Sequence, residues 1–552
     1  MRRLALLASL FALTALAACR LSTAQAVAAP AAGMRTERVA MRDGTRLATD
    51  IYLPAGGGRH PAILLRTPYN KDGGASLGAD GARRGYAIVV QDTRGRFASE
   101  GLNLPFESDG WWDGRWDGYD TLEWISRQPW CDSHIGTSGG SALGVAQLLA
   151  AGTGTRRIAA QVVHVGAGSF YPDVVYPGGV FKRALAEDWL RATRYAPDAL
   201  SRWTAHPTYD SYWRTRDLAL RYAKVDAPAV HVGGWYDIFA RGTIEAFQGY
   251  QTHGGPRARG HQKLVMGPWT HGIFQSTAGE LQFPIGNRPP GKVADPWAWF
   301  DRYLKGVQNG VDREPAVTYY VMGDTTDPSA PGNQWRTADR WPPVPTRETP
   351  LYLRSNRSLS LAAPDSSDAA LTYVYDPADP TPGVGGTHLT IPAGPMEQSR
   401  VEGRRDLLVF TGEPLPAPIE VTGTPRADIW FSSDAPDTDL FVTLCDVHPN
   451  GRSYNICDGR LRLRFREGFE RGRPMAPGRV YRVRFDLWPT SIVFNRGHRI
   501  RVQIASCNAP GYDPNPNTGA PFRSGPERRP ARNSVRADAA HASRLLLPVA
   551  VP

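Results

Sequence analysis

Residues 134–147 read HIGTSGGSALGVAQ, and this stretch decides the fold class. Its small residues suit a tight turn from a strand into a helix, which lifts a serine hydroxyl clear of a sheet. The following helix would point its N-terminus at a reacting carbonyl group. Two serines compete: Ser138 lies in the literal Gly-x-Ser-x-Gly pattern, whereas Ser141 comes directly before the apolar helical stretch. Because the serine of such an elbow immediately precedes the helix, we expect Ser141 to be a nucleophile; a loop without catalysis is the alternative for the motif alone.

An acid and a histidine follow two other strand patterns, each at the point where the strand ends. Asp237 closes GGWYD after the apolar run 229–232, and His271 closes MGPWTH after the run 263–266. The chain order serine, aspartate, histidine is that of the α/β-hydrolases. There His271 would accept the serine proton and return it to the leaving group, while Asp237 would orient the imidazole. Each residue alone could be an ordinary surface aspartate or one of 12 histidines, but the shared placement and order favour a catalytic triad.

Short apolar strand patterns alternate with helical patterns through the first half of the chain. After a hairpin pattern at 37–53, strand patterns cover 62–65, 87–90, 160–165, 229–232 and 263–266, and helical patterns cover 119–127 and 142–151. This alternation predicts a parallel sheet covered by helices. From about residue 349, short strand patterns are separated by Pro, Gly and Asp, as at 408–411, 427–432, 440–445, 480–487 and 499–504. The second half therefore predicts a β-sandwich.

These patterns set the expected domain boundaries. We expect an α/β fold of the α/β-hydrolase type over 35–165 and 226–345. The interruption at 166–225 is rich in Trp, Tyr and Arg and predicts an inserted helical cap at the edge where parallel sheets bind ligands. An all-β sandwich domain would follow over 346–552, with the proline-rich stretch 342–350 as the linker.

The segment 1–26 has the pattern of an export leader. Two arginines precede the apolar stretch Leu4–Ala18, which is shorter than the ~20 residues that a spanning helix needs. The sequence LAAC ending at Cys19 resembles a bacterial lipobox, so we expect cleavage before Cys19 and lipid attachment to it. A plain signal cut after Ala26 is the alternative. We expect an exported protein, periplasmic or at the cell surface, attached to a bacterial membrane by its N-terminal lipid only.

Composition and cysteine usage limit the remaining classes. With 41% hydrophobic and 10% aromatic residues among 552, the chain can build large cores, which excludes a disordered protein. The net charge is +11, but the basic residues are scattered without a nucleic-acid-binding motif, so we expect no nucleic-acid partner. No Cys/His spacing is typical of a metal site, and we expect no metal or cofactor. Cys445 and Cys457 flank the turn signal PNG at 449–451; they could form a disulfide across a hairpin or remain buried thiols.

Longer motifs extend through nearly the whole chain after the leader. They are RTPYNK at 66–71, QDTRGRFASEG at 91–101, DGYDTLEWI at 117–125, DTD at 437–439, DVHPNG at 446–451, GHRIR at 497–501 and NPNTG at 515–519. Together they resemble the superfamily of cocaine esterases, α-amino-acid ester hydrolases and X-prolyl dipeptidyl-peptidases. The resemblance implies an α/β-hydrolase domain followed by a jelly roll, with a triad at Ser141, Asp237 and His271.

The same resemblance implies an oxyanion hole. It would consist of the Tyr69 hydroxyl and the backbone N–H of Ala142, donors worth on the order of 3–4 kcal/mol each in related chemistry. The family usually has tyrosine directly after the nucleophile, where this chain has Ala142. The backbone donor is kept, whereas the pocket shape near the acyl group is put in doubt. An ordinary core or turn tyrosine is the alternative for Tyr69.

The residues after the triad aspartate bear on the substrate. The α-amino-acid ester hydrolases carry acids two and three places after it, whereas this chain has Phe239 and Ala240, which cannot pair with an ammonium group. We therefore expect Trp235 and Phe239 to line an apolar substrate pocket, although core packing explains Trp235 equally well. The expected function is a serine hydrolase of small-molecule acyl esters, amides or peptides. The alternatives are an X-Pro dipeptidyl aminopeptidase and an inactive surface protein that binds glycans; a homo-oligomer stays open.

Overall fold

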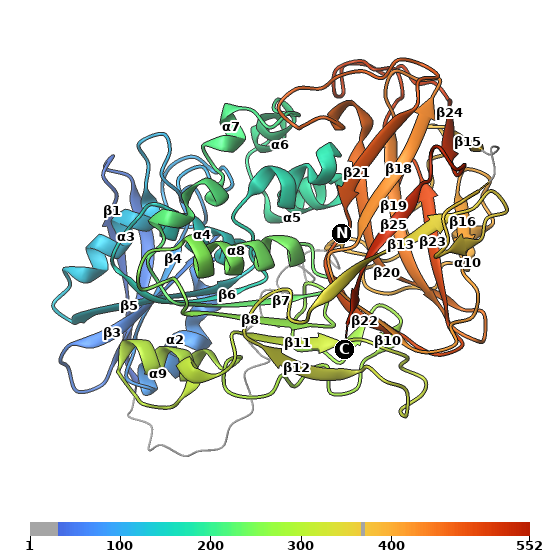
Figure 1. Ribbon diagram of the computed structural model, residues 1–552. Helices are drawn as coiled ribbons and strands as arrows, with labels where there is room; N and C mark the ends of the chain where they lie inside the picture. The colour runs from blue at the N-terminus through green and yellow to red at the C-terminus, as the bar shows by residue number, and fades with distance from the viewer. Residues whose placement is uncertain (1–30, 366–369, 552) are drawn as a thin grey trace.

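The computed structural model describes residues 31–365 and 370–551. Figure 1 shows a helix-covered sheet from the first half of the chain, a β-sandwich from the second half, and a group of short helices beside both. The leader and Cys19 lie outside the described residues. Across the described ranges, no helix has the length and hydropathy that a membrane span requires.

A ten-stranded, mostly parallel sheet forms the centre of the first domain. Its strands in spatial order are β1 (Ala31–Ala40), β2 (Arg46–Pro54), β4 (Ala87–Asp92), β3 (His60–Thr67), β5 (Cys131–Gly140), β6 (Ile158–His164), β7 (Ala229–Gly234), β8 (Gln262–Gly267), β11 (Val317–Val321) and β12 (Gln334–Ala338). The strands from β4 to β11 run parallel, and β1, β2 and β12 are antiparallel additions at the edges. The predicted parallel sheet is confirmed.

Helices cover both faces of this sheet. They are α2 (Ala75–Arg83) and α9 (Pro296–Leu304) on one face, and α3 (Asp117–Ser126), α4 (Ala142–Gly152) and α8 (Ala240–His253) on the other. Successive strand side chains alternate between the faces. Ile63 accordingly belongs to the same buried cluster as Trp299 of α9, whereas Leu64 belongs to the cluster that contains Leu122 of α3. Burial on both faces explains why these strands read as continuous apolar runs.

The cap lies between β6 and β7 and consists of short helical segments. They are η2 (Tyr171–Val175), η3 (Pro177–Gly179), η4 (Ala184–Asp188), α5 (Trp189–Thr193), α6 (Asp198–Thr204), α7 (Ser211–Arg214) and η5 (Leu218–Lys224). Helices this short are not stable on their own and depend on packing. Most of their aromatic side chains form one cluster with Val145 and Leu149 of α4. The cap is therefore fixed to the helix that follows the predicted elbow.

The second domain is a sandwich of two antiparallel sheets. The nine-stranded sheet contains β13 (Thr346–Leu353), β14 (Leu359–Ser360), β15 (Ala370–Tyr375), β17 (Ile419–Gly423), β18 (Arg426–Ser433), β21 (Tyr481–Asp486), β22 (Thr490–Phe494), β24 (Ala531–Arg536) and β25 (Arg544–Ala550). The four-stranded sheet has the order β16 (Leu408–Thr411), β23 (Arg499–Ala505), β19 (Asp439–Val447) and β20 (Ser453–Arg462). The five strand patterns predicted here all coincide with strands.

The remaining elements of both domains are short. They are η1 (Lys71–Gly74), β9 (Thr277–Ala278), β10 (Leu281–Gln282), η6 (Val311–Arg313), α10 (Ser399–Glu402) and η7 (Leu463–Phe465).

The boundary between the domains differs from the predicted linker. Residues 342–350 are proline-rich, yet β13 already begins at Thr346 and pairs with β25 from Thr346 to Tyr352. A single hydrophobic cluster joins the sandwich core to Trp235 and Tyr236 of the first domain. The two domains therefore share a core instead of being joined by an open linker.

The disulfide suggested between Cys445 and Cys457 is absent from the described residues, where both are buried free thiols. The hairpin of β19 and β20 has Cys445 opposite Asn455, and a register shift then brings Cys457 opposite Leu444. The two cysteines are therefore not directly opposed, as a cross-strand disulfide at this spacing would require.

Candidate active site

Ser141 lies at the turn that joins β5 to α4. Its backbone has φ 58° and ψ −125°, a conformation that a side chain other than glycine adopts only under strain. Small neighbours allow the turn: a Cβ on Gly144 would come within 2.9 Å of the His164 carbonyl oxygen. Ser138, the competing serine, lies inside β5 opposite Val162. The elbow thus belongs to Ser141.

The structure brings Ser141, His271 and Asp237 together from three strand ends. The Ser141 Oγ lies 2.8 Å from His271 Nε2, and His271 Nδ1 lies 2.5 Å from Asp237 Oδ1. The Asp237 side chain is fully buried, and its Oδ2 accepts the Phe239 backbone N–H at 2.8 Å. Both carboxylate oxygens are therefore engaged, which fixes the carboxylate toward the imidazole. The arrangement is that of a nucleophile, a base and a group that orients the base.

Tyr69 stands after β3 and brings its hydroxyl to the same centre. Trp189 Nε1 of the cap donates a hydrogen bond to this hydroxyl at 3.0 Å. Burial raises the pKa of Tyr69, and hydrogen bonds with Trp189 and Ser141 offset part of the increase. The hydroxyl therefore keeps its proton and can donate it. Ala142 is the first residue of α4, so its N–H has no acceptor within the helix.

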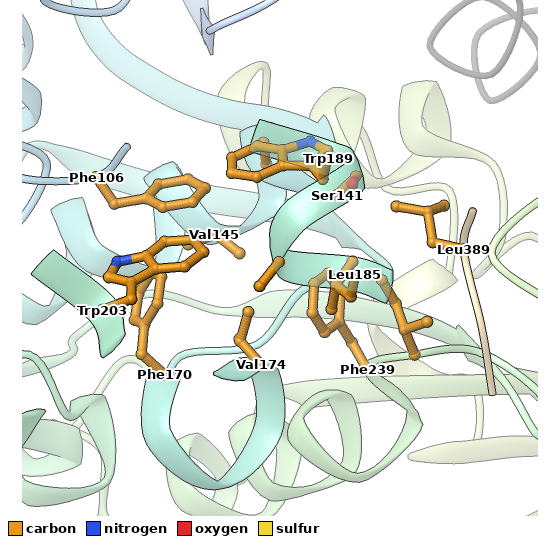
Figure 2. A pocket seen from close by; sticks show the side chains of 13 residues that line it. Phe106, Ser141, Val145, Phe170, Val174, Leu185, Trp189, Trp203, Phe239 and Leu389 are labelled. Carbon is orange, nitrogen blue, oxygen red and sulfur yellow. The ribbon is translucent and has the colours of Figure 1, made fainter. Parts of the chain in front are cut away.

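A cavity opens beside Ser141 (Figure 2). It is lined by Phe106, Ser141, Ala142, Val145, Phe170, Val174, Leu185, Ala186, Trp189, Trp203, Ile238, Phe239 and Leu389. None of these described lining residues carries a charged side chain. Phe106 and Trp203 each lie nearly parallel to the Trp189 ring, with interplanar angles of 4° and 1°. The cavity thus has three nearly parallel aromatic rings in its lining, and apart from Ser141 its other lining side chains are aliphatic or phenylalanine.

The two predicted pocket residues have different positions. Phe239 lines the cavity and contacts the His271 ring edge to face, with centroids 5.6 Å apart. Trp235 does not line it: its Nε1 donates to the Tyr320 carbonyl at 2.8 Å, and its ring packs on Trp341 in the core shared by the domains. The pocket assignment of Trp235 was therefore wrong, because the indole points away from the strand end and into the domain boundary.

Three side chains that act on the site from other parts of the chain, Trp189, Trp488 and Leu389, were not predicted from the sequence. For Trp189, the only signal in the sequence was that the cap segment is rich in aromatic residues, which does not indicate a contact with Tyr69. Trp488 of the sandwich donates its Nε1–H to the Asp237 backbone carbonyl at 3.3 Å, and no local motif marks it. Leu389, also from the second domain, completes the cavity lining. The site is therefore assembled from the hydrolase sheet, the cap and the sandwich.

Comparisons with known proteins agree with this architecture. The sequence model of the X-Pro dipeptidyl-peptidase (S15 family) matches residues 43–197 and 182–273, and that of the X-Pro dipeptidyl-peptidase C-terminal non-catalytic domain matches residues 309–546. Cocaine esterase from Rhodococcus sp. (strain MB1 Bresler) is 33% identical, over 93% of this chain and 97% of that protein.

Two solved structures are similar over nearly the full length. An aminopeptidase from the marine sediment archaeon Thaumarchaeota archaeon has a TM-score of 0.81 at 25% identity, covering 96% of this chain and 98% of that one. An α-amino acid ester hydrolase has a TM-score of 0.79 at 25% identity with the same coverage. The chain has a serine at the elbow, an imidazole oriented by Asp237 and a C-terminal jelly-roll domain. It belongs to the serine hydrolase family that includes cocaine esterase and the S15 X-Pro dipeptidyl-peptidases.

Proposed function

We propose that this serine hydrolase cleaves esters or amides of an uncharged, apolar acyl group. The observation that carries the proposal is the cavity beside Ser141, whose described lining lacks a charged side chain. Burial of an apolar acyl group there would contribute about 25 cal/mol per Å² removed from water. The nearly parallel rings of Phe106, Trp189 and Trp203 favour an aromatic acyl group, since aromatic rings pack well in offset-parallel or edge-to-face arrangements.

The proposed mechanism follows from the geometry around Ser141. His271 Nε2 accepts the serine proton as Oγ bonds to the acyl carbon, and Asp237 stabilises the imidazolium that results. The Tyr69 hydroxyl and the Ala142 N–H receive the negative charge that develops on the carbonyl oxygen. Collapse expels the leaving group with the proton from His271 and leaves an acyl-serine. Water then attacks this ester with His271 as the base, which releases the acid and restores Ser141.

A paired test of the nucleophile uses the two competing serines. Ser141→Ala should abolish labelling by a fluorophosphonate probe and lower kcat on the order of 10⁵-fold or more, since a triad without its nucleophile loses nearly all triad catalysis. Ser138→Ala is the matched control and should keep labelling and turnover. The reverse pattern would overturn the assignment of Ser141, and circular dichroism would show that both variants fold.

An X-Pro dipeptidyl aminopeptidase is the second candidate, because the matched family model bears that name. Such an enzyme needs an anion for the substrate ammonium group. Phe239 and Ala240 occupy the positions where the ester hydrolases carry acids, and both are buried apolar residues here. We therefore expect the p-nitrophenyl ester of phenylglycine to gain nothing in kcat/KM over p-nitrophenyl phenylacetate. A tenfold preference for the ammonium form, ~1.4 kcal/mol, or rapid cleavage of Ala-Pro p-nitroanilide would favour the aminopeptidase.

We propose further that the protein is exported and attached by lipid at Cys19. The support is the sequence alone: a short apolar leader ends in LAAC at Cys19. Cells grown with labelled palmitate should yield labelled wild-type protein in the membrane fraction. Cys19→Ser should lose both the label and the membrane association. Unlabelled wild-type protein would instead support a plain signal cut near Ala26.

A further inference from the structure

Three ionisable side chains far apart in the sequence meet at the boundary of the two domains, away from the cavity. Asp324 follows β11 of the hydrolase sheet, His448 follows β19, and His498 precedes β23. Each is buried, and one ligand atom from each lies within 4.8 Å of those of the other two. The cluster has no part in the chemistry at Ser141.

Asp446 orients one member of this cluster. Its two carboxylate oxygens each lie 3.0 Å from His498 Nδ1, so that nitrogen carries the hydrogen and donates it. His498 Nε2 then faces Asp324 Oδ2 at 3.1 Å. A neutral imidazole would point a lone pair at a carboxylate here, which is unfavourable unless a metal ion lies between them or the imidazole carries a second proton. A carboxylate that orients the far nitrogen of a ligating histidine is the usual outer partner of a zinc ligand.

His448 supplies the second, independent observation. Its side chain is 5% exposed, and its ring packs against that of His498 at an interplanar angle of 43°, with centroids 4.5 Å apart. Its Nδ1 lies 3.7 Å from Asp324 and its Nε2 lies 3.7 Å from Asp446, both beyond hydrogen-bond distance. A buried imidazole with this geometry is held beside the carboxylates without bonding to either.

The spacing of the donor atoms fits a tetrahedral ion. With Zn–N and Zn–O bonds of about 2.0–2.2 Å, neighbouring ligand atoms would be roughly 3.3–3.5 Å apart. His498 Nε2 lies 3.1 Å from Asp324 Oδ2 and His448 Nδ1 lies 3.7 Å from Asp324 Oδ1, so each carboxylate oxygen has one imidazole nitrogen close to that distance. Two imidazoles and one carboxylate suit zinc better than calcium or magnesium, which prefer oxygen ligands.

We propose that Asp324, His448 and His498 bind one Zn²⁺, with Asp446 orienting His498. The ion ties the end of β11 to β19 and β23, so it stabilises the contact between the hydrolase sheet and the sandwich. A water molecule completes the coordination, and the role is structural because the site lies apart from the cavity that Ser141 lines.

The test measures metal binding and stability directly. Full-length protein stripped with dipicolinate and titrated with Co²⁺ should bind one equivalent with the intense visible absorption of tetrahedral cobalt. Zn²⁺ should displace it and raise the Tm of the stripped protein by about 3 °C or more, because an ion that binds the folded state stabilises it. Less than a tenth of an equivalent of either metal, with unchanged Tm, would overturn the proposal and leave His498 as an imidazolium between two carboxylates.

Two variants locate the metal. His448→Gln should weaken Co²⁺ binding at least tenfold, whereas His541→Gln, in a more exposed His541–Asp538 pair of the same domain, should bind like wild type. Wild-type affinity in His448→Gln would exclude the site. If His448→Gln does not fold, Asp324→Asn replaces it, and the wild-type titration decides by itself. Ser141→Ala should bind metal normally, so a failure here is distinct from a failure of the proposed hydrolase chemistry.

Discussion

At the scale of single residues, the Tyr69 hydroxyl shows how the cap and the hydrolase sheet cooperate. Trp189 donates to its oxygen, which leaves the phenolic hydrogen free for an oxyanion beside Ser141. Tyr69→Phe removes that donor and keeps the ring. Because the interaction strengthens in the transition state, kcat should fall about 10²–10³-fold with little change in KM.

The same variant separates a catalytic from a packing role. Steady-state kinetics on an acyl ester and the rate of fluorophosphonate labelling should both slow, while the Tm stays near that of wild type. If Tyr69→Phe keeps more than about a third of wild-type kcat, the second oxyanion donor must be a backbone amide, since one lost donor ordinarily costs far more than that.

The sequence predicted these residues unevenly, and the reason is physical. Asp237 and His271 each follow an apolar strand pattern, and Ser141 lies in a small-residue turn directly before an apolar helical pattern, so local sequence places all three at one edge of a parallel sheet. Trp235 follows the same kind of strand, but the direction of its indole depends on the sandwich that packs there. No local pattern contains that information.

At the scale of elements, the turn between β5 and α4 depends on Gly144, the third residue of α4, which lies against the His164 carbonyl group. Gly144→Ala would put a Cβ 2.9 Å from the His164 carbonyl oxygen, and backbone cannot move aside cheaply. We expect a loss of about 1–3 kcal/mol of stability, as for other overpacked sites, together with a lower kcat from a displaced Ser141. Urea denaturation and ester kinetics measure the two effects.

Gly403→Ala is the matched control for this substitution. Gly403 is exposed, has a negative φ, and its added Cβ would meet nothing within 4 Å. It should change neither stability nor activity measurably. An unchanged Gly144→Ala enzyme would show that α4 can shift away from β6 without disturbing the nucleophile.

Within the sandwich, Asp428 on β18 joins three arginines of neighbouring strands. It is buried and contacts Arg482, Arg484 and Arg544 at 2.7 to 3.2 Å. Burial raises its pKa, but the hydrogen bonds and charges of Arg482 and Arg484 outweigh burial and hold the pKa at about 2. The ionised form therefore stabilises the folded state above the unfolded pKa near 4, and this contribution is lost as pH falls from about 4 to 2.

Asp428→Asn tests the direction of this pH dependence of stability. The variant should unfold at lower urea than wild type at pH 7, by about 2 kcal/mol, and the difference should shrink at pH 3. Asp434→Asn, at a half-exposed position after the same strand, should cost much less. A difference between Asp428→Asn and wild type that stays constant between pH 7 and pH 3 would contradict a depressed pKa.

At the element scale, the hairpin of β19 and β20 shows where pattern reading fails. The turn and both strands are evident in the sequence, but the register shift beside Cys445 is not. A single extra residue in one strand changes which side chains face each other. Whether Cys445 and Cys457 are opposed therefore cannot be deduced from their distances to the turn.

At the scale of the whole molecule, the substrate cavity depends on the sandwich. Leu389 lines it, and Trp488 donates to the backbone of Asp237. Leu389→Ala removes apolar surface from the cavity, so if the proposed acyl group binds there, kcat/KM for a phenylacetyl ester should fall about three- to tenfold. An acetyl ester, too short to reach this wall, should be cleaved as by wild type. Both rates come from p-nitrophenol release.

Leu361→Ala provides the comparison, since Leu361 is 65% exposed in the same domain. It should leave both esters unaffected. Equal losses on the two esters in Leu389→Ala would indicate a general disturbance of the fold instead of a contact with the acyl group. Neither Leu389 nor Trp488 could be predicted as part of the site, because each comes from the domain whose sequence signals only strands and turns.

The pairing of β13 with β25 has a consequence for the growing chain. Residues 346–353 find their partner strand only at 544–550, a separation of roughly 200 residues. A ribosome adding about 5–20 residues per second needs about 10–40 s to cover that interval. Throughout it, β13 presents an unpaired edge that could associate with other chains. We therefore expect newly made protein to require a holding chaperone until β25 emerges, and the enzyme to become active only after its jelly roll closes.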